Sequence, residues 1–351
     1  KELLFKAGEM NVSIRFSPIT IEAYNEWVAR QGKHRYIITI LGRRITAKQI
    51  AAVSKIVAEQ QLNIDAIQRL TGRMPLHEGE EAMDKSCIEF SVRGTPIDKS
   101  QMQKALMELA SELEFDVSMQ EDNIYRRSRR LICFDMDSTL IETEVIDELA
   151  IRAGVGDEVK AITESAMRGE IDFKESFTRR VALLKGLDAS VMKDIAENLP
   201  MSEGIERLMS VLKRTGYKIA ILSGGFTYFG NYLKQKFGID YVYANELEIE
   251  DGKLTGRYVG EIVDGKRKAE LLRLLAQVEN VNIAQTIAVG DGANDLPMLS
   301  TAGLGIAYHA KPKVKAGAKQ SISTIGIDGV LYFMGFKDSF ITDGNDFSMP
   351  Q

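Results

Sequence analysis

The sequence of 351 residues has few cysteines, few prolines and no long apolar run. Its two cysteines, Cys87 and Cys133, lie far apart in separate strand-like runs, which excludes a disulfide framework and favours a reducing cytoplasm. With only 7 prolines, 44% hydrophobic and 27% charged residues, the composition is typical of a soluble globular protein. No apolar run approaches the ~20 residues that span a bilayer, and the start, Lys1 to Leu4, lacks a signal-peptide pattern. We therefore expect no membrane partner.

Charge of one sign is not in large excess either, because 45 lysines and arginines face 50 aspartates and glutamates, for a net charge of -5. That balance provides no general attraction to nucleic acid or to an anionic membrane surface. The basic stretch from Arg126 to Arg130 could contact the phosphates of a nucleic acid, but we favour a solvated linker that leads into a strand. His77 and His309 are isolated and lack metal-ligand spacing. We expect no nucleic-acid partner.

The chain is longer than a usual single domain, so we expect two or three domains and a sizeable core. Changes in the sequence pattern predict an N-terminal segment at 1–33, a first domain at 34–122, a linker at 123–130, a second domain at 131–335 and a C-terminal tail at 336–351. The N-terminal segment contains a strand-like piece at 12–16 and a helix-like piece at 19–29.

The first domain shows two copies of one element order. Strands are predicted at 36–41, 62–70, 87–93 and 114–119, with helices at 46–60 and 98–112. This β-α-β-β-α-β order, a ferredoxin-like α+β arrangement, resembles the ACT family of regulatory domains. The resemblance implies a regulatory amino acid as ligand and a homodimer, and it suggests that 1–33 is the remnant of a second regulatory unit.

From residue 131 onward, short apolar strands alternate with amphipathic helices. The pattern predicts an α/β fold with a doubly wound, mostly parallel sheet. The candidate strands are 131–135, 217–222, 240–244, 283–289 and 303–307. A long helical stretch at about 145–200 separates the first two strands, and a connection of that length needs a fold of its own. We interpret it as a helical cap inserted over a site.

Two carboxylates, Asp135 and Asp137, follow the apolar strand at 131–135. They can share a bound group only if they lie at the open end of the strand. Because no adjacent histidine or lysine activates a serine or cysteine, Asp135 is the candidate nucleophile, and Asp137 is the candidate acid and base. A carboxylate that attacks a phosphate dianion needs a cation, and Asp135, the carbonyl of Asp137 and Asp291 suit Mg²⁺. The alternative for an isolated Asp-x-Asp is a solvated turn.

Three further segments point to phosphate chemistry, and each lies near the end of a strand or the start of a helix. Ser223 and Gly224 precede a helix, where a hydroxyl and bare amides can bind phosphate, although Ser-Gly-Gly also occurs in ordinary turns. In the loop from Val289 to Asp295, Asp291 would bind metal while Asn294 and Asp295 orient its surroundings. Alternatively, Asp291 could cap a helix in an ordinary turn. Lys268 could neutralise phosphate and nucleophile together or be a solvated helix-start lysine.

The joint pattern, in this order along the chain, resembles the haloacid dehalogenase (HAD) superfamily of phosphotransferases over residues 131 to about 335. Within it the chain resembles the phosphoserine phosphatase family, because Glu144 follows the nucleophile turn and the cap contains Phe173 and Arg180 in similar contexts. The resemblance implies that Glu144 binds the amino group and Arg180 the carboxylate of phosphoserine, and that Phe173 closes over it. It also implies that Ser223, Gly224, Lys268 and Asn294 contact substrate.

The physical chemistry of the substrate agrees with these roles, because a zwitterion needs one anionic and one cationic partner. Arg179 competes with Arg180, but a spacing of seven residues places Arg180 on the face of Phe173. Glu144 has an alternative role as a first-turn helix acid. We therefore expect Mg²⁺-dependent hydrolysis of O-phospho-L-serine through an Asp135 phosphoenzyme, the last step of serine biosynthesis.

Two alternatives stay open. One keeps the chemistry but uses another small phosphate ester, or an acceptor other than water. The other is an amino-acid sensor with an inactive enzyme-like domain, which the presence of all the candidate catalytic residues disfavours.

Overall fold

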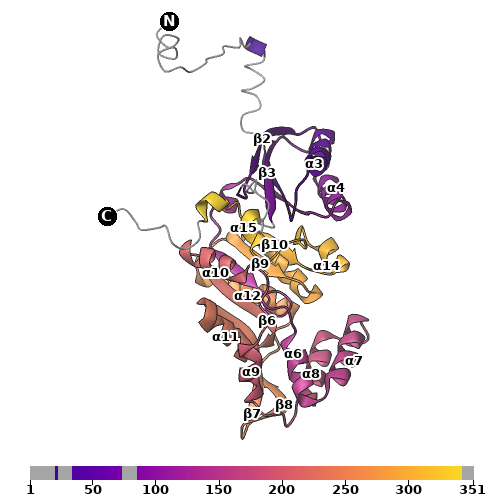
Figure 1. Ribbon diagram of the computed structural model, residues 1–351, viewed down its shortest axis with the longest axis vertical. Coiled ribbons are helices and arrows are strands. Elements are labelled where there is room, and N and C mark those ends of the chain that lie inside the picture. The colour runs from indigo at the N-terminus through magenta and orange to yellow at the C-terminus, as the bar shows by residue number, and fades with distance from the viewer. Residues whose placement is uncertain (1–19, 23–33, 73–84, 342–351) are drawn as a thin grey trace, which may run out of the picture.

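The computed structural model describes residues 20–22, 34–72 and 85–341. Figure 1 shows a small N-terminal domain with its own sheet, a larger α/β domain below it, and a group of helices that projects from the larger domain. The strand expected at 12–16 and most of the helix expected at 19–29 lie outside the described residues. Among the residues described, no helix is both long and apolar enough to cross a membrane.

The N-terminal domain has the predicted element order. Its elements are β1 (Arg35–Gly42), α3 (Ala47–Glu59), β2 (Asn63–Arg69), β3 (Ser86–Arg93), α4 (Lys99–Glu112) and β4 (Asp116–Glu121). The strands form an antiparallel sheet in the order β2-β3-β1-β4. The buried helix positions Val53, Val57, Met102 and Leu106 recur at spacings of four residues, so each helix presents one apolar stripe to the sheet.

Both faces of the central strand β1 are covered. Ile38 and Ile40 pack with the helices of the N-terminal domain, whereas Leu41 belongs to the core of the larger domain. Alternate residues of a strand point to opposite faces, which explains why the whole run from Tyr36 to Leu41 is apolar or buried. The two domains therefore share a buried contact along β1.

The larger domain contains a seven-stranded sheet in the order β11-β10-β9-β5-β6-β7-β8. Its strands are β5 (Leu131–Phe134), β6 (Lys218–Phe226), β7 (Tyr241–Glu250), β8 (Lys253–Val259), β9 (Thr286–Gly290), β10 (Leu304–Tyr308) and β11 (Gln320–Ile322). All neighbours run parallel except β7 and β8. The predicted doubly wound fold is confirmed.

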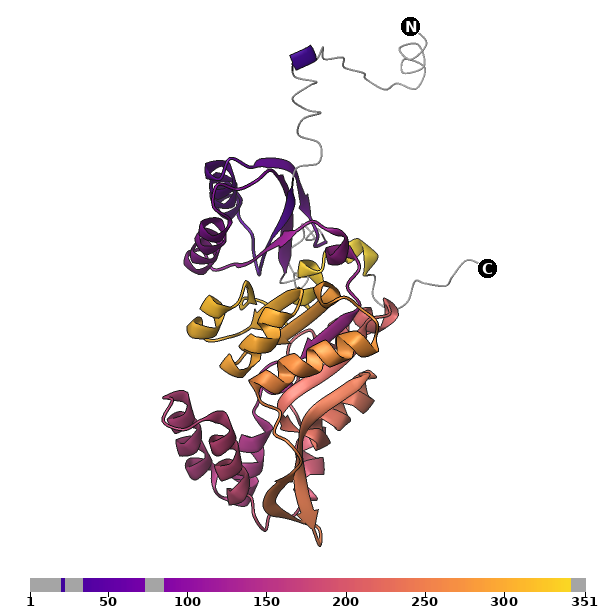
Figure 2. The same cartoon turned by 180° about the vertical axis from the view of Figure 1, so that it is seen from behind.

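Helices cover both faces of this sheet. In β5, Ile132 and Phe134 pack with α10 (Ile205–Arg214) and α11 (Thr227–Phe237), whereas Leu131 and Cys133 face α12 (Gly265–Val278) and α13 (Leu296–Thr301). Figure 2 shows α12 lying across the second face. Cys87 and Cys133 are both buried and free, as the sequence predicts.

The stretch between β5 and β6 is helical, as predicted. It contains α6 (Val145–Ala153), α7 (Gly156–Met167), α8 (Phe173–Leu183) and α9 (Val191–Glu197), and α6 to α8 form the projecting group in Figure 1. The β7-β8 hairpin supports this cap, because Gly186 N–H donates to the Leu254 carbonyl and Leu254 N–H donates to the Leu187 carbonyl. The sequence analysis missed β8 and β11 and ended β7 too early.

The interpretation of the basic stretch as a solvated linker is wrong for two of its arginines. Residues Ile124–Arg127 form the short helix α5, and the side chains of Arg126 and Arg129 are buried. Arg126 pairs with Glu89 at 2.9 Å and Arg129 donates to Gln120 Oε1 at 2.7 Å. A buried arginine needs such partners, so these side chains hold the linker against the N-terminal domain and are not available to phosphates.

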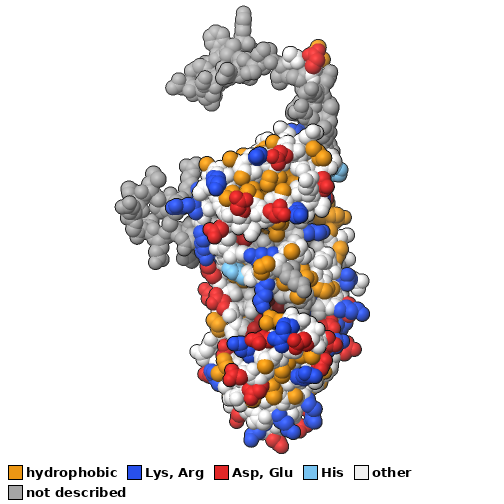
Figure 3. All heavy atoms as spheres, turned by 90° about the vertical axis from the view of Figure 1, so that its right-hand side faces the viewer, with side chains coloured by type: hydrophobic (Ala, Val, Ile, Leu, Met, Phe, Trp, Pro, Cys, Tyr) orange, Lys and Arg blue, Asp and Glu red, His pale blue; other side chains and the backbone are white. Residues whose placement is uncertain are grey.

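Charges on the surface are mixed. Figure 3 shows acidic and basic side chains interspersed over the face that it presents, without one continuous basic area. The segment from 336 to 341 packs against the N-terminal domain, because Asp338 N–H donates to the Leu70 carbonyl and Gly72 N–H donates to Asp338 Oδ2. The domain boundaries given above remain predictions.

Candidate active site

Three neighbouring parallel strands deliver the predicted residues to one edge of the sheet. Asp135 follows β5, Ser223 lies near the end of β6, and Asp291 follows β9. The order β9-β5-β6 brings these ends together, because carboxyl ends of parallel strands meet at the same edge. Asp135 N–H continues the ladder by donating to the Val289 carbonyl at 2.9 Å.

Asp135 is held on one side only. Its Oδ1 atom accepts a hydrogen bond from Met136 N–H at 2.8 Å and lies 2.9 Å from Lys268 Nζ. Within the described parts of the chain, no hydrogen bond reaches its Oδ2 atom. Lys268, fully buried, also donates to Asp295 Oδ1 at 2.7 Å. Burial alone would lower the pKa of Lys268, but the charges of Asp135 and Asp295 raise it, so the ammonium stays protonated.

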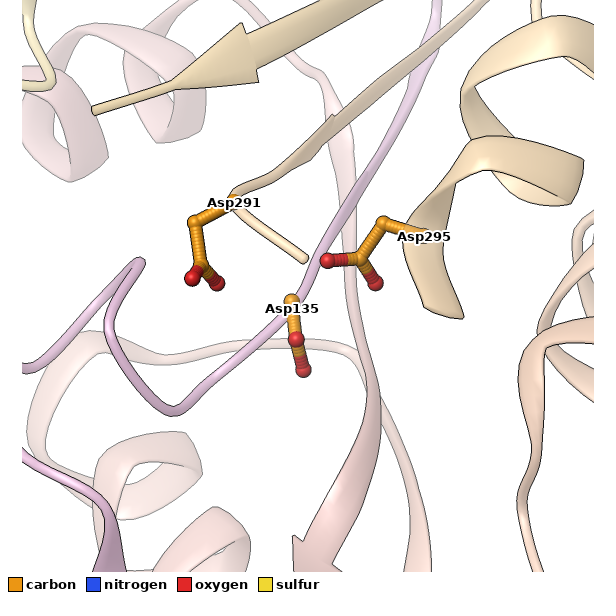
Figure 4. A group of neighbouring side chains, drawn as sticks. All are labelled: Asp135, Asp291 and Asp295. Carbon is orange, nitrogen blue, oxygen red and sulfur yellow. The ribbon is translucent and has the colours of Figure 1, made fainter. Parts of the chain in front are cut away.

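Asp135, Asp291 and Asp295 converge at this edge. Figure 4 shows Asp291 and Asp295 on either side of Asp135, and one oxygen from each carboxylate lies within 4.8 Å of the others. Burial, and then the charges of Asp135 and Asp295, raise the pKa of Asp291 to about 8. Crowded carboxylates of this kind fit a divalent cation with hard oxygen ligands, which would relieve their repulsion.

Asp295 differs from the other two carboxylates because both of its oxygens have protein partners. Oδ1 accepts from Lys268 Nζ and Oδ2 accepts from Gly292 N–H at 2.9 Å. Gly290 allows this approach, since a Cβ there would lie 2.4 Å from the carboxyl carbon of Asp295. These contacts support the predicted role of Asp295 in orienting the site rather than binding metal directly.

Asp137 is buried beside the Ser-Gly-Gly segment. A Cβ on Gly225 would lie 2.6 Å from Asp137 Oδ2, so only glycine permits this contact. Burial, together with the charges of Glu144 and Asp135, raises the pKa of Asp137 well above its ordinary value. A carboxyl group whose pKa is raised holds its proton more firmly, as a general acid must before it donates.

Asn245, which the sequence analysis missed, holds the Ser223-Gly224 segment in place. Asn245 Nδ2 donates to the Gly224 carbonyl at 2.8 Å, and Asn245 Oδ1 accepts from Val263 N–H at 2.8 Å. Asn245 is buried, and it connects the glycine segment to the residues that precede α12. The signal in the sequence was a lone asparagine directly after the strand run 240–244.

The cap reaches the glycine segment through Phe173. A Cβ added to Gly224 would lie 3.0 Å from Phe173 Cζ, so the ring contacts the glycine. Phe173 also stacks on Phe177, with ring centroids 6.3 Å apart. Beside it, Lys174 Nζ lies 3.4 Å from Asp264 Oδ2 at the start of α12. The first turn of α8 therefore bridges the cap and the larger domain.

Glu144 and Arg180 provide opposite charges on the cap side. Glu144 precedes α6 and accepts a hydrogen bond from Ser138 Oγ at 2.9 Å. Desolvation by the surrounding chain and the nearby Asp135 and Asp147 raise the pKa of Glu144. Burial lowers the pKa of Arg180, while Glu144, Asp147 and Asp137 oppose that shift, which places the guanidinium in an acidic environment.

Arg179 and Arg180 differ in their exposure and in their contacts. Arg179 is exposed and pairs with Glu175 on its own helix, whereas Arg180 is partly buried. Among the described residues, no ion pair joins Arg180 to Glu144. The two side chains therefore lie near each other without a direct ion pair.

The amide of Asn294 lies beside the acidic cluster. Asn294 belongs to the short turn Ala293–Asp295 at the start of α13, and its Oδ1 atom folds over Gly292, where an added Cβ would be only 2.2 Å away. Its carbonyl approaches Gly265 at the start of α12. The turn thus joins the helix that carries Lys268 to the loop that carries Asp291.

A further groove lies elsewhere in the described part of the chain. It has a volume of about 1290 Å³ and lies between α3 and α4 of the N-terminal domain and α14 (Pro312–Gly317) and β11 of the larger domain. We place the chemistry at the acidic cluster, because the candidate nucleophile Asp135, the ammonium of Lys268 and the candidate acid Asp137 lie close together there.

Comparison with known families agrees with this architecture. The haloacid dehalogenase-like hydrolase family matches residues 132–300, and the ACT domain family matches residues 34–120. These two matches coincide with the larger and the N-terminal domain.

The individual relatives and solved structures compared with this chain below are phosphoserine phosphatases or probable ones. A phosphoserine phosphatase of Streptomyces coelicolor is 43% identical over 305 residues, which cover 87% of this chain and 72% of the relative. A structure of a probable phosphoserine phosphatase from Vibrio cholerae aligns with a TM-score of 0.67 and 36% identity over 85% of this chain and 86% of that one. A phospho-aspartyl intermediate analogue of phosphoserine phosphatase aligns with a TM-score of 0.56 and 43% identity over 59% and 99%. This chain belongs to the phosphoserine phosphatase family of haloacid dehalogenase-like hydrolases and carries an N-terminal ACT domain.

Proposed function

We propose that this protein hydrolyses O-phospho-L-serine to L-serine and phosphate, the last step of serine biosynthesis, through a phosphorylated Asp135. The observation that carries the proposal is the geometry of Asp135, whose Oδ1 is held by Lys268 while its Oδ2 has no partner among the described residues. A carboxylate that is fixed on one side and open on the other is suited to attack phosphorus. The phospho-aspartyl analogue of a relative supports the same intermediate.

The acidic cluster is proposed to bind Mg²⁺ through Asp135, Asp291 and the carbonyl of Asp137. A divalent cation bound there supplies the positive charge that lets a carboxylate approach a phosphate dianion. Lys268 contributes a second, permanent positive charge from the other side of Asp135.

The proposed reaction has two displacements. Asp135 attacks phosphorus and forms an acyl phosphate while the bond from phosphorus to the serine oxygen breaks, and Asp137 gives its proton to that oxygen. Asp137 then takes a proton from water, whose oxygen attacks the same phosphorus, and Asp135 leaves as a carboxylate. The raised pKa of Asp137 supports the first proton transfer.

Substrate selection is proposed to come from the cap. Arg180 would bind the substrate carboxylate and Glu144 its ammonium group, with Phe173 closing over the bound molecule. Ser223, Gly224 and Asn294 would contact the phosphate oxygens. The partly buried, acid-flanked position of Arg180 and the absence of an Arg180–Glu144 ion pair within the described residues support this assignment.

Phosphate release from phosphoserine, with Mg²⁺ and with a chelator, tests this function directly. We expect turnover that the chelator abolishes and that Mg²⁺ restores. Other small phosphate esters, tested alone and with acceptor alcohols, should give lower kcat/KM values than phosphoserine, because these esters lack one charged end of the substrate. A higher kcat/KM for an ester without an amino acid moiety would contradict the proposal.

The ACT domain suggests a regulatory amino acid and a homodimer, and both remain proposals. Calorimetry of the full chain with L-serine tests the first, and sedimentation of the full chain tests the second. Heat of binding that vanishes when the active site is blocked by phosphate would exclude a separate regulatory site for serine.

A further inference from the structure

The two chain segments that connect the cap to the larger domain lie side by side. Glu142 N–H donates to the Pro200 carbonyl at 2.9 Å, and Ser202 N–H donates to the Leu140 carbonyl at 3.1 Å. Ile141 and Met201 form an antiparallel bridge between these bonds. We call residues 139–142 and 200–204 the cap hinge, because any rotation of the cap relative to the sheet must act on this pair.

The N-terminal domain holds the hinge through Arg43. This arginine follows β1, and its guanidinium forms two hydrogen bonds to Glu203, at 2.9 Å to Oε1 and 2.5 Å to Oε2. Its Nε atom donates to the Thr324 carbonyl of the larger domain at 3.0 Å. A two-bonded arginine to carboxylate contact fixes orientation as well as distance.

Lys85 provides a second contact between the N-terminal domain and the hinge segment 200–204. Lys85 Nζ lies 2.6 and 2.8 Å from the two oxygens of Asp328 and 3.9 Å from Glu203 Oε1. Asp328 is fully buried and lies in close contact with Gly204 of the hinge, since a Cβ on Gly204 would lie 2.3 Å from Asp328 Oδ1. Ile327 N–H also donates to the Glu203 carbonyl at 2.8 Å.

The hinge leads directly to the acidic cluster. Ser202 Oγ donates to the Thr139 carbonyl at 2.7 Å, and Thr139 Oγ1 donates to Asp291 Oδ1 at 3.3 Å. Thr139 is buried and lies four residues after Asp135. Hydrogen bonds, together with the peptide bond between Ser202 and Glu203, therefore connect Arg43 through Thr139 to the candidate metal ligand Asp291.

We propose that the ACT domain positions the cap hinge, and through it the nucleophile loop, by means of Arg43 and Lys85, with Glu203 as the positioning residue that receives both. The N-terminal domain is then part of the device that sets the turnover rate, and a shift of that domain changes the rate through the hinge. The rate effect rests on the proposed phosphatase function, whereas the mechanical link does not.

The test uses the full chain with the double substitution Arg43→Met and Lys85→Met, the conservative variant Arg43→Lys, and the control Lys337→Met. Lys337 donates to Gln68 at 3.0 Å, so the control breaks a bond between the domains that does not touch the hinge. Two quantities are measured: hydrogen exchange of the hinge amides of Glu142 and Ser202, and kcat and KM for phosphoserine with Mg²⁺.

We expect the double variant to exchange its hinge amides on the order of tenfold faster and to lose about fivefold in kcat, as coupling of 1 to 3 kcal/mol between sites allows. Arg43→Lys keeps the charge but loses the two-bonded contact, so it should lie between the parent and the double variant, and Lys337→Met should change neither quantity. A folded double variant with parental exchange and kcat overturns the proposal, as does an equal loss in Lys337→Met.

If the double variant does not fold, Glu203→Gln replaces it under the same criteria, because Lys85 then keeps Asp328 and Arg43 keeps Thr324. If the parent protein does not hydrolyse phosphoserine, the proposed function fails, yet the exchange measurement still decides whether the N-terminal domain holds the hinge.

Discussion

Two buried charge networks in this molecule differ in their balance. At the candidate active site, the carboxylates of Asp135, Asp137, Asp291 and Asp295 share one ammonium, that of Lys268. At the domain junction, Asp328 and Asp338 are matched by Lys85 and Arg207. The first network has an excess of negative charge, whereas the second is neutral.

The difference indicates what each network is for. Buried charges are tolerated when they are paired, and the junction satisfies this rule, with Arg207 Nη1 2.8 Å from Asp328 Oδ2 and Arg207 Nη2 2.7 Å from Asp338 Oδ1. The active-site network violates the rule, and burial together with the charges of Asp135 and Asp295 raises the pKa of Asp291. The active-site carboxylates, which outnumber their positive partners, therefore need a cation from solution. The paired charges at the junction instead hold parts of the chain together.

The largest effect should follow from Asp135→Asn. Turnover of phosphoserine should fall on the order of 10³-fold or more, because the amide cannot form the acyl phosphate. The melting temperature should stay the same or rise, since one carboxylate leaves a crowded cluster. Phosphate release and thermal unfolding measure the two quantities, and substantial activity in a verified pure variant would refute the nucleophile assignment.

The opposite result is expected at the junction. Asp328→Asn leaves Lys85 and Arg207 without their buried carboxylate, so the free energy of unfolding should fall by about 3 kcal/mol, as for other broken buried pairs. Chemical denaturation measures this change. An unchanged midpoint would mean that the balanced network does not stabilise the contact between the domains.

A smaller effect is expected for the charges of the cap. Arg180→Met should raise KM for phosphoserine about 10- to 100-fold, the cost of one unmatched charge-assisted contact of about 1 to 3 kcal/mol. Arg179→Met is the matched control, because that neighbour pairs with Glu175 on the surface. Steady-state kinetics with phosphoserine compares the two variants. Equal losses in both would contradict the assignment of Arg180.

The smallest effect concerns pH. The folded, metal-free protein holds the Asp291 proton up to about pH 8, whereas the unfolded chain releases it near 3.8. Between these values the folded state binds more protons, so this group makes stability fall as pH rises. Metal binding must displace that proton, and Mg²⁺ should therefore bind more tightly at pH 8.5 than at pH 6 in a calorimetric titration. Tighter binding at pH 6 would contradict the picture of the crowded cluster.

Much of the candidate site could be predicted from the sequence because its residues follow strands. Asp135, Ser223 and Asp291 each come after an apolar run, and parallel strands bring such ends together. The hairpin of β7 and β8 was missed although Asp251-Gly252 is a typical turn signal. Asn245 was missed because a lone asparagine acquires meaning only when Gly224 and Val263 are its neighbours.

The sequence by itself determined the element order of the N-terminal domain, the strands of the larger domain that lead to the site, and the identity of the charged groups at their ends, because periodicity and strand termini are local properties. Only the tertiary structure decided that Arg126 and Arg129 are buried, that Asp328 pairs with Lys85, and that Arg43 holds the cap hinge. The contacts of Arg126, Arg43 and Lys85 join residues from 37 to 243 positions apart. No local pattern encodes them, since the partner of a charge is set by the folded chain as a whole.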